Sequence, residues 1–226
     1  MRVLFVTGSG TDIGKTYVTA LLVRQLVAAG RPVVALKPLV SGVPDWRDPE
    51  FSLSDTAVLL AAQDLDLNTA TVDACSPWRF TAPLSPDMAA TQQGQSLAFA
   101  DVVEWTRAAI ARAPADAVVV IEGVGGAMSP ITEDATGLDW LQALGCPALL
   151  VAGSYLGAIS HALTTHAAMT ARGVNVAGLI VNETLGSTVA LAGTVAALKR
   201  FLPGANVQPL EREAATALHV VDAMLA

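Results

Sequence analysis

Five short apolar runs recur along the chain, and longer segments of helical periodicity separate them. The runs are rich in Val, Leu and Ile and lack the polar alternation of a strand that has one face in solvent. They therefore predict strands that are buried on both faces. The expected strands are Val3 to Val6, Val33 to Leu36, Ala117 to Ile121, Ala148 to Ala152 and Val174 to Val181.

Apolar residues at helical spacing fill most of the segments between the runs. Because strand and helix alternate, the pattern predicts a three-layer α/β fold, a mostly parallel sheet with helices on both faces. The expected helices are Thr16 to Ala29, Asp55 to Ala62, Phe99 to Ala113, Ala158 to Arg172, Thr188 to Phe201 and Glu213 to Leu225. Two polar stretches, Ser41 to Ser54 and Ser76 to Pro86, are expected to be long loops. Ligands of such sheets bind beyond the carboxyl ends of the strands, so functional residues should follow the strands.

Composition and charge limit the number of domains and the kinds of partner that this chain can have. The 226 residues are 53% hydrophobic and 15% charged, which suffices for one core, so we expect a single domain over residues 1–226. The net charge is -7, and Lys and Arg do not cluster anywhere. Nucleic acid is therefore excluded as a partner, because a polyanion is met by clustered cations.

A stretch from Trp140 to Ala171 has no charged residue, which raises the question of a membrane span. Gly, Pro, Ser and His residues interrupt it, and we interpret it as a buried strand followed by a covered helix. The N-terminal residues do not have the pattern of a signal peptide, so a cytoplasmic protein without a membrane span is expected. Cys75 and Cys146 stand far apart with no CxxC partner, which indicates core or wall residues rather than a disulfide or a zinc site.

The first expected strand leads directly into a phosphate-binding loop. Its residues are Gly8-Ser9-Gly10-Thr11-Asp12-Ile13-Gly14-Lys15-Thr16, and an apolar helix follows at once. In this setting the backbone N–H groups and the start of the helix face phosphates, Lys15 reaches the terminal phosphates, and the Thr16 hydroxyl binds Mg²⁺. Ser9 stands where the usual GxxxxGKT spacing has glycine, so the loop is a variant. The alternative is a strand-to-helix turn that merely needs flexibility.

Two acidic residues and a second lysine are candidates for the same site. Glu122 ends a buried strand and is followed by Gly123-Val124-Gly125-Gly126, and Asp55 opens a short helix. Carboxylates are hard oxygen ligands for Mg²⁺, although Glu122 could instead cap its loop and Asp55 could simply favour the helix dipole. Lys37 ends the second strand, where a buried ammonium needs an anion unless it reaches solvent along the surface. A second cation beside Lys15 would offset charge on a moving phosphoryl group, so Lys37 and Lys15 are the candidate catalytic residues.

The order of these motifs resembles the dethiobiotin synthetase family over nearly the whole chain. The resemblance rests on the loop with Thr11 and Asp12 and on a series of short motifs. These motifs are Lys37-Pro38 with Ser41-Gly42, Ser54-Asp55, Ser85-Pro86, Glu122-Gly123-x-Gly125-Gly126, Leu156-Gly157-x-Ile159-Ser160-His161-Ala162 and Val181-Asn182. It implies a P-loop NTPase-like fold and a homodimer. It also implies an enzyme of biotin biosynthesis that joins CO₂ to 7,8-diaminopelargonate, activates the carbamate with ATP and closes a cyclic urea.

The resemblance also implies roles for individual residues. Mg²⁺ as cofactor would be held by Thr16, Asp55 and Glu122. The ATP-binding residues would be Asp12, Ile13, Gly14, Lys15, Thr16, Tyr17, Asp55, Glu122, Gly123, Val124, Gly125, Asn182, Glu183, Gln208, Pro209 and Leu210, with Asn182 at the base. The substrate would contact Thr11, Lys37, Ser41, Leu156, Gly157 and Ser160, the last three from the neighbouring subunit at a helix start.

Some residues depart from the family pattern, and other functions stay open. Asp12 stands where Glu is common, Ser160 where Asn is expected, and Asp87 where some relatives have His. The alternatives are a P-loop switch ATPase that acts through protein partners, a relative that modifies a corrinoid precursor, and a scaffold with an inactive loop. His161 and His166 are expected to be packing or interface residues, and His219 has no evident role.

Overall fold

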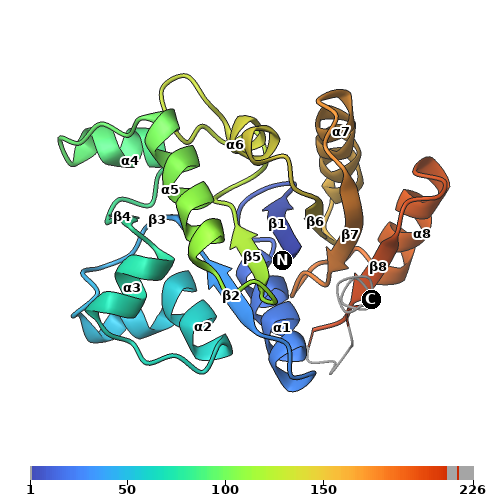
Figure 1. The fold of residues 1–226 in the computed structure, drawn as a ribbon. Coiled ribbons are helices and arrows are strands. Elements are labelled where there is room, and N and C mark those ends of the chain that lie inside the picture. Colours follow the sequence, from blue (N-terminus) through green and yellow to red (C-terminus); the bar gives the residue numbers. More distant parts are fainter. Residues whose placement is uncertain (1, 213–217, 219–226) are drawn as a thin grey trace.

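The computed structural model describes residues 2–212 and residue 218 (Figure 1). Six parallel strands form the main sheet, in the order β2-β5-β1-β6-β7-β8. Their bounds are β1 Arg2–Gly8, β2 Val33–Leu36, β5 Val118–Glu122, β6 Ala148–Gly153, β7 Val176–Asn182 and β8 Val207–Leu210. The strand order places the carboxyl ends of β2, β5 and β1 next to one another.

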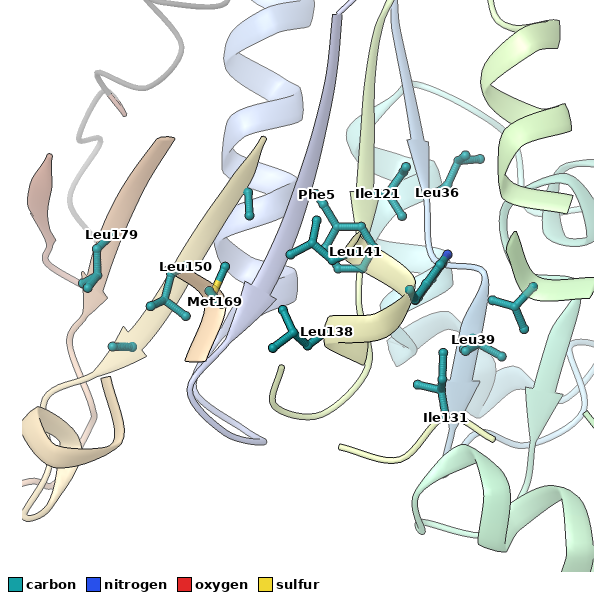
Figure 2. Close-up of a cluster of buried hydrophobic side chains, with 14 of the residues drawn as sticks. Phe5, Leu36, Leu39, Ile121, Ile131, Leu138, Leu141, Leu150, Met169 and Leu179 are labelled. Carbon is teal, nitrogen blue, oxygen red and sulfur yellow. The ribbon is translucent and has the colours of Figure 1, made fainter. Parts of the chain in front are cut away.

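Helices cover both faces of this sheet, which confirms the three-layer α/β prediction. Consecutive residues of β1 serve opposite faces: Phe5 belongs to one buried cluster, and Leu4 and Val6 belong to the other. Helices α5 (Phe99–Arg112), α6 (Gly137–Leu144), α7 (Ala158–Ala171) and α8 (Leu191–Phe201) contribute to the first cluster. Figure 2 shows that cluster. Helices α1 (Lys15–Ala28) and α2 (Asp55–Ala62) contribute to the second. Two apolar faces explain why the strand runs lack polar alternation.

A second, smaller sheet lies beside the main one and corrects the expectation of two long loops. Strands β3 (Leu39–Ser41) and β4 (Trp78–Phe80) pair in parallel. The segment between them holds the 3₁₀ helix η1 (Pro49–Leu53), α2 and α3 (Thr69–Cys75), and α4 (Pro86–Gln92) follows β4. The stretches Ser41 to Ser54 and Ser76 to Pro86 are therefore loops only in part. Elements of three to seven residues are too short to give a periodic signal.

Other boundaries also differ from the expectations. Helix α8 begins at Leu191 rather than Thr188, and α6 and β8 were not expected. Helix α6 has local start and stop residues, because Thr136 and Asp139 form a capping box and Gly145 ends the helix with a φ of 65°. The expected helix over Glu213 to Leu225 lies outside the described residues, of which only Leu218 belongs to it.

The uncharged stretch from Trp140 to Ala171 forms the end of α6, β6 and α7. The strand is buried as expected, but α7 exposes its outer side, including Ser160 and His161, so the expectation of a covered helix is wrong for this protomer. Among the helices of the described residues, none has the length and apolar composition to span a membrane.

The outer edge of β2 is closed by a side chain. Gln63, just after α2, accepts a hydrogen bond from the Ala35 N–H through Oε1 at 2.7 Å and donates to the Ala35 carbonyl through Nε2 at 3.2 Å. Cys75 lies on the same side, where its carbonyl accepts the Lys37 N–H at 3.0 Å. Cys75 and Cys146 are free thiols, and burial raises the pKa of each to about 11. Both are thus unreactive wall residues.

Candidate nucleotide and metal site

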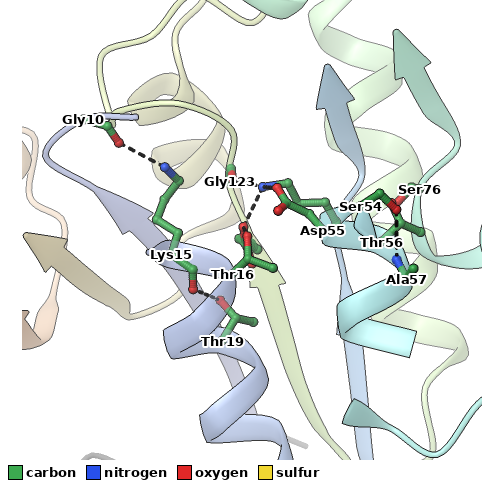
Figure 3. Close-up of polar contacts among 12 residues, drawn as sticks. Gly10, Lys15, Thr16, Thr19, Ser54, Asp55, Thr56, Ala57, Ser76 and Gly123 are labelled. Carbon is green, nitrogen blue, oxygen red and sulfur yellow. Dashed lines mark hydrogen bonds and ion pairs between the residues drawn. The ribbon is translucent and has the colours of Figure 1, made fainter. Parts of the chain in front are cut away.

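The phosphate loop joins β1 to α1 in a tight turn. Gly14, the residue before α1, has a φ of 86°, and a Cβ on it would lie 2.2 Å from Asn182 Nδ2, so a larger residue does not fit. Asp12 has a φ of 56°, a region that Asp tolerates better than most residues. Lys15 turns back over the loop and donates from Nζ to the Gly10 carbonyl at 3.0 Å (Figure 3). The turn between β1 and α1 therefore depends on a glycine at position 14.

Four predicted site residues form one hydrogen-bonded cluster beside this loop, centred on two buried side chains, Lys37 and Glu122. Lys37 Nζ donates to Glu122 Oε1 at 2.6 Å and to the Gly123 carbonyl at 2.9 Å, and it lies 3.0 Å from Asp55 Oδ2. The Thr16 hydroxyl donates to the same Glu122 Oε1 at 2.7 Å. Lys37 is 2% exposed and Glu122 is fully buried.

The sheet topology brings this cluster together. Strands β2, β5 and β1 are neighbours, so Lys37 after β2, Glu122 at the end of β5 and the loop after β1 meet at one edge. Asp55 arrives from the first turn of α2, whose N-cap Ser54 accepts the Ala57 N–H through its hydroxyl at 3.2 Å.

Charge pairing governs the ionisation of these groups. Burial would lower the pKa of Lys37, but the charges of Glu122 and Asp55 outweigh it and hold the pKa above its usual value. For Asp55, burial acts to raise the pKa, but the charge of Lys37 and smaller effects outweigh it, so the pKa is below its usual value. Burial, helped by the charge of Lys37, lowers the pKa of Lys15 to about 8 and outweighs the opposite effect of the carboxylates of Glu122, Asp55 and Asp12. Lys15 is therefore the cation that most needs an anion.

These residues surround a cavity of about 350 Å³. Its lining residues are Thr11, Asp12, Gly14, Lys15, Thr16, Lys37, Val40, Ser41, Asp55, Val124 and Gly125. All except Val40 were candidates from the sequence. Val40 is an ordinary apolar residue of β3, and nothing in its local sequence sets it apart. Ser129 was also not foreseen: its hydroxyl accepts the Gly126 N–H at 2.8 Å and braces the turn at Gly125.

The residues expected at the base form a second group beside the loop. Asn182 Nδ2 donates to the Ile13 carbonyl at 3.0 Å, and its buried Oδ1 has no protein partner among the described residues. The Glu183 N–H donates to the Leu210 carbonyl at 2.9 Å. Three further candidates lie close by: Tyr17 is near Gly14, and the neighbouring strand β8 carries buried Gln208 and exposed Pro209.

The third group of candidates lies at the start of α7 and does not line the cavity. Leu156 is 90% exposed, and Ser160 is exposed as well. Gly157 precedes the helix with a φ of 97°. Tyr155, which was not a candidate, shares a hydrogen bond of 2.9 Å between its hydroxyl and Nδ1 of His161. Asp87 is also remote from the cavity, because it lines a separate groove beside α4 and α5.

The oxygen donors fit a divalent cation that arrives with a nucleotide. Glu122 Oε2 is buried and has no hydrogen-bond partner among the described residues, so this acceptor can take a cation. The described residues contain no group of three or more His, Cys, Asp or Glu placed to hold a metal. Two carboxylates and one hydroxyl suit Mg²⁺, which takes its remaining ligands from water and phosphate.

Comparison with solved structures shows the fold class. The signal recognition particle receptor FtsY from Elizabethkingia anophelis, solved with GDP, aligns with 98% of this chain and 61% of its own, with a TM-score of 0.52 and 14% identity. FtsY from Thermotoga maritima aligns with 100% of this chain and 68% of its own, with a TM-score of 0.50 and 20% identity. Both support a P-loop NTPase-like architecture.

Sequence comparison is more specific. A family model described as an AAA domain matches residues 2–216. The ATP-dependent dethiobiotin synthetase of Methylobacterium nodulans is 60% identical over 187 residues, which cover 83% of each chain. That of Caulobacter sp. strain K31 is 46% identical over 208 residues, 91% of this chain and 86% of the relative. This chain belongs to the ATP-dependent dethiobiotin synthetase family.

Proposed function

We propose that this protein forms dethiobiotin from 7,8-diaminopelargonate, CO₂ and ATP, with release of ADP and phosphate. The observation that carries the proposal is the single cavity that joins both buried lysines to Thr11, Ser41 and the carboxylate of Asp55. The relatives named above have this activity in their names.

The chemistry needs two cations and no protein nucleophile. One substrate amine attacks CO₂ and gives a carbamate, whose oxygen takes the γ-phosphoryl group of ATP as ADP leaves. The second amine then attacks the activated carbon, phosphate departs, and the cyclic urea closes. Because the substrate amines are the nucleophiles, unreactive Cys75 and Cys146 are consistent with this route.

The lysines take separate roles in this proposal. Lys15 binds the β- and γ-phosphates from the loop. The negative charge of these phosphates raises the low pKa of its ammonium group. Lys37, which lines the same cavity after β2, stabilises charge on the carbamate and the moving phosphoryl group. Ser41 and Thr11 line the same cavity as Lys37, and in this proposal they hold the amines and the carbamate.

Mg²⁺ bound through Thr16, Asp55 and Glu122 would neutralise charge on the phosphate oxygens. Asn182 presents a buried acceptor, Oδ1, beside the loop, and we assign it to the amino group of the base.

We further propose a homodimer that acts in the cytoplasm, where ATP is available. Support for the dimer comes from the start of α7, because Leu156 and Ser160 are exposed and lie outside the cavity of their own protomer. If these residues bind the substrate carboxylate, a second copy has to bring them to the site.

The switch ATPase is the weaker alternative, because it gives no reason for a cavity that Lys37 and Ser41 line together with the phosphate loop. The test is to incubate the pure protein with ATP, Mg²⁺, bicarbonate and 7,8-diaminopelargonate and to detect dethiobiotin by mass spectrometry together with released phosphate. A matched reaction without the diamine is the control. Phosphate release at the same rate in that control, with no dethiobiotin in the full reaction, would favour the switch ATPase.

A further inference from the structure

The contacts of Lys37 exhaust its hydrogen-bonding capacity. An ammonium group has three protons. Glu122 Oε1, Asp55 Oδ2 and the Gly123 carbonyl lie 2.6, 3.0 and 2.9 Å from Nζ, which accounts for all three. In this arrangement Lys37 has no proton left to donate to a phosphoryl group or a carbamate.

Two of these three partners are oxygens that a divalent cation would use. Glu122 Oε1 also accepts the Thr16 hydroxyl at 2.7 Å, so one carboxylate oxygen connects Lys37 with the third candidate metal ligand. Lys37 is 2% exposed, and a buried ammonium with two carboxylates in contact balances their charge. A divalent cation at Glu122 and Asp55 would do the same, and the two positive charges cannot both stay among these oxygens without repulsion.

We propose that Lys37 and the divalent cation exchange places on Glu122 and Asp55. The metal enters only when nucleotide phosphates add enough negative charge to displace the ammonium, and the displaced ammonium then has protons free for the reacting groups. The exchange rests on the proposed function for the identity of those groups. The exchange regulates the site in two ways. Lys37 prevents the metal from binding without nucleotide, and the Lys37 ammonium can contact the carbamate only after the metal–nucleotide complex is bound.

The test measures Mn²⁺ binding in the absence of nucleotide, by the loss of the free Mn²⁺ signal in electron paramagnetic resonance. Wild-type protein should bind Mn²⁺ weakly, and Lys37→Met should bind it at least tenfold more tightly, because its two carboxylates lose their counterion. Adding Glu122→Gln to that variant should abolish the gain. Lys199→Met is the matched control, since Lys199 is an exposed lysine of α8, and its affinity should equal that of wild type. Equal Mn²⁺ affinity in a folded Lys37→Met variant and in wild type would overturn the exchange.

A second measurement uses wild-type protein and does not depend on the folding of Lys37→Met. Lys15, Lys37 and Lys199 are the only lysines in the sequence, so ¹³C-lysine labelling gives three Cε signals. Lys15→Arg and Lys199→Arg variants assign them. Millimolar Mg²⁺ alone should leave the Lys37 signal in place, and Mg²⁺ with ADP should shift it. A Lys37 signal whose chemical shift changes with Mg²⁺ alone, or does not change with Mg²⁺ and ADP together, would contradict the proposal.

Failure of the exchange and failure of the proposed function are distinguishable. The binding and labelling experiments contain no diamine. Tight Mn²⁺ binding by Lys37→Met, together with no dethiobiotin production by wild-type protein, would support the exchange and refute the proposed reaction. Dethiobiotin production by wild-type protein, together with a Mn²⁺ affinity of Lys37→Met equal to that of wild type, would support the reaction and refute the exchange.

Discussion

The cluster around Lys37 and the start of α7 differ in how completely one protomer builds them. Lys37 and Glu122 are buried, and each hydrogen-bonds to residues from other elements within 3 Å. Leu156 and Ser160 are exposed and lie outside the cavity. The difference teaches that the sheet itself organises the end of the site around Lys37 and Glu122, whereas our proposal brings the carboxylate end from a second copy.

The largest effect is expected from Lys37→Ala, which removes the centre of the buried cluster. Dethiobiotin formation should fall about 1,000-fold, because the lost cation stabilises charge that develops during phosphoryl transfer. Nucleotide binding, measured by calorimetry, should change much less. Lys199→Ala is the control and should keep full activity. Undiminished product formation in Lys37→Ala would remove this residue from the mechanism.

Glu122→Gln weakens the same end of the site while keeping its shape. The variant should lose about 100-fold in kcat and should need more Mg²⁺ for half-maximal rate, because an amide is a poorer ligand for a hard cation. Steady-state rates across a magnesium titration check this, with Glu104→Gln on the exposed side of α5 as control. An unchanged magnesium requirement would reassign Glu122 to a structural role.

Leu156→Asp probes the exposed end of the comparison. A negative charge before α7 should compete with the substrate carboxylate and raise KM for the diamine about tenfold, which corresponds to about 1.4 kcal/mol. The KM for ATP should not change. Leu65→Asp changes a leucine that is 46% exposed and should affect neither constant. A rise in both KM values would indicate general damage rather than a local carboxylate site.

The smallest effect concerns the proton on Lys15. With a pKa of about 8 this lysine is mostly neutral at pH 8.5, and bound phosphates favour its charged form. Nucleotide binding should then take up most of one proton at pH 8.5 and much less at pH 7, and affinity should fall as pH rises above 8. Calorimetry in two buffers of different ionisation enthalpy measures the uptake. Lys15→Arg stays charged throughout, so equal uptake in that variant would assign the proton to another group.

That Lys37 and Glu122 lie together beside the phosphate loop could be predicted from the sequence, for a physical reason. Strand ends converge in a parallel sheet, so a lysine after one strand and a glutamate after another could be expected near the phosphate loop. The neighbouring order of β2, β5 and β1 could not be read from the chain, because sheet order depends on long-range packing. Val40 was missed because its role comes only from its place on β3, a strand of three residues.

Short elements account for most errors in the fold. Strand β8 has four residues, one of them Pro209, and β4 has three, so neither gives an alternation that can be recognised. Helix α6 could have been found from Thr136, Asp139 and Gly145, whose capping roles are local. The exposure of α7 could not, because its sequence is rich in Ala and small polar residues that suit either a covered or an open face.

Gln63 has a consequence for how molecules of this protein meet one another. The free edge of a sheet can recruit a strand from a neighbouring molecule, which leads to aggregation. The Gln63 amide hydrogen-bonds to both the N–H and the carbonyl of Ala35, as one residue of an additional strand would. Together with the Cys75 carbonyl, which accepts the Lys37 N–H, this side chain therefore protects the outer edge of β2 against self-association.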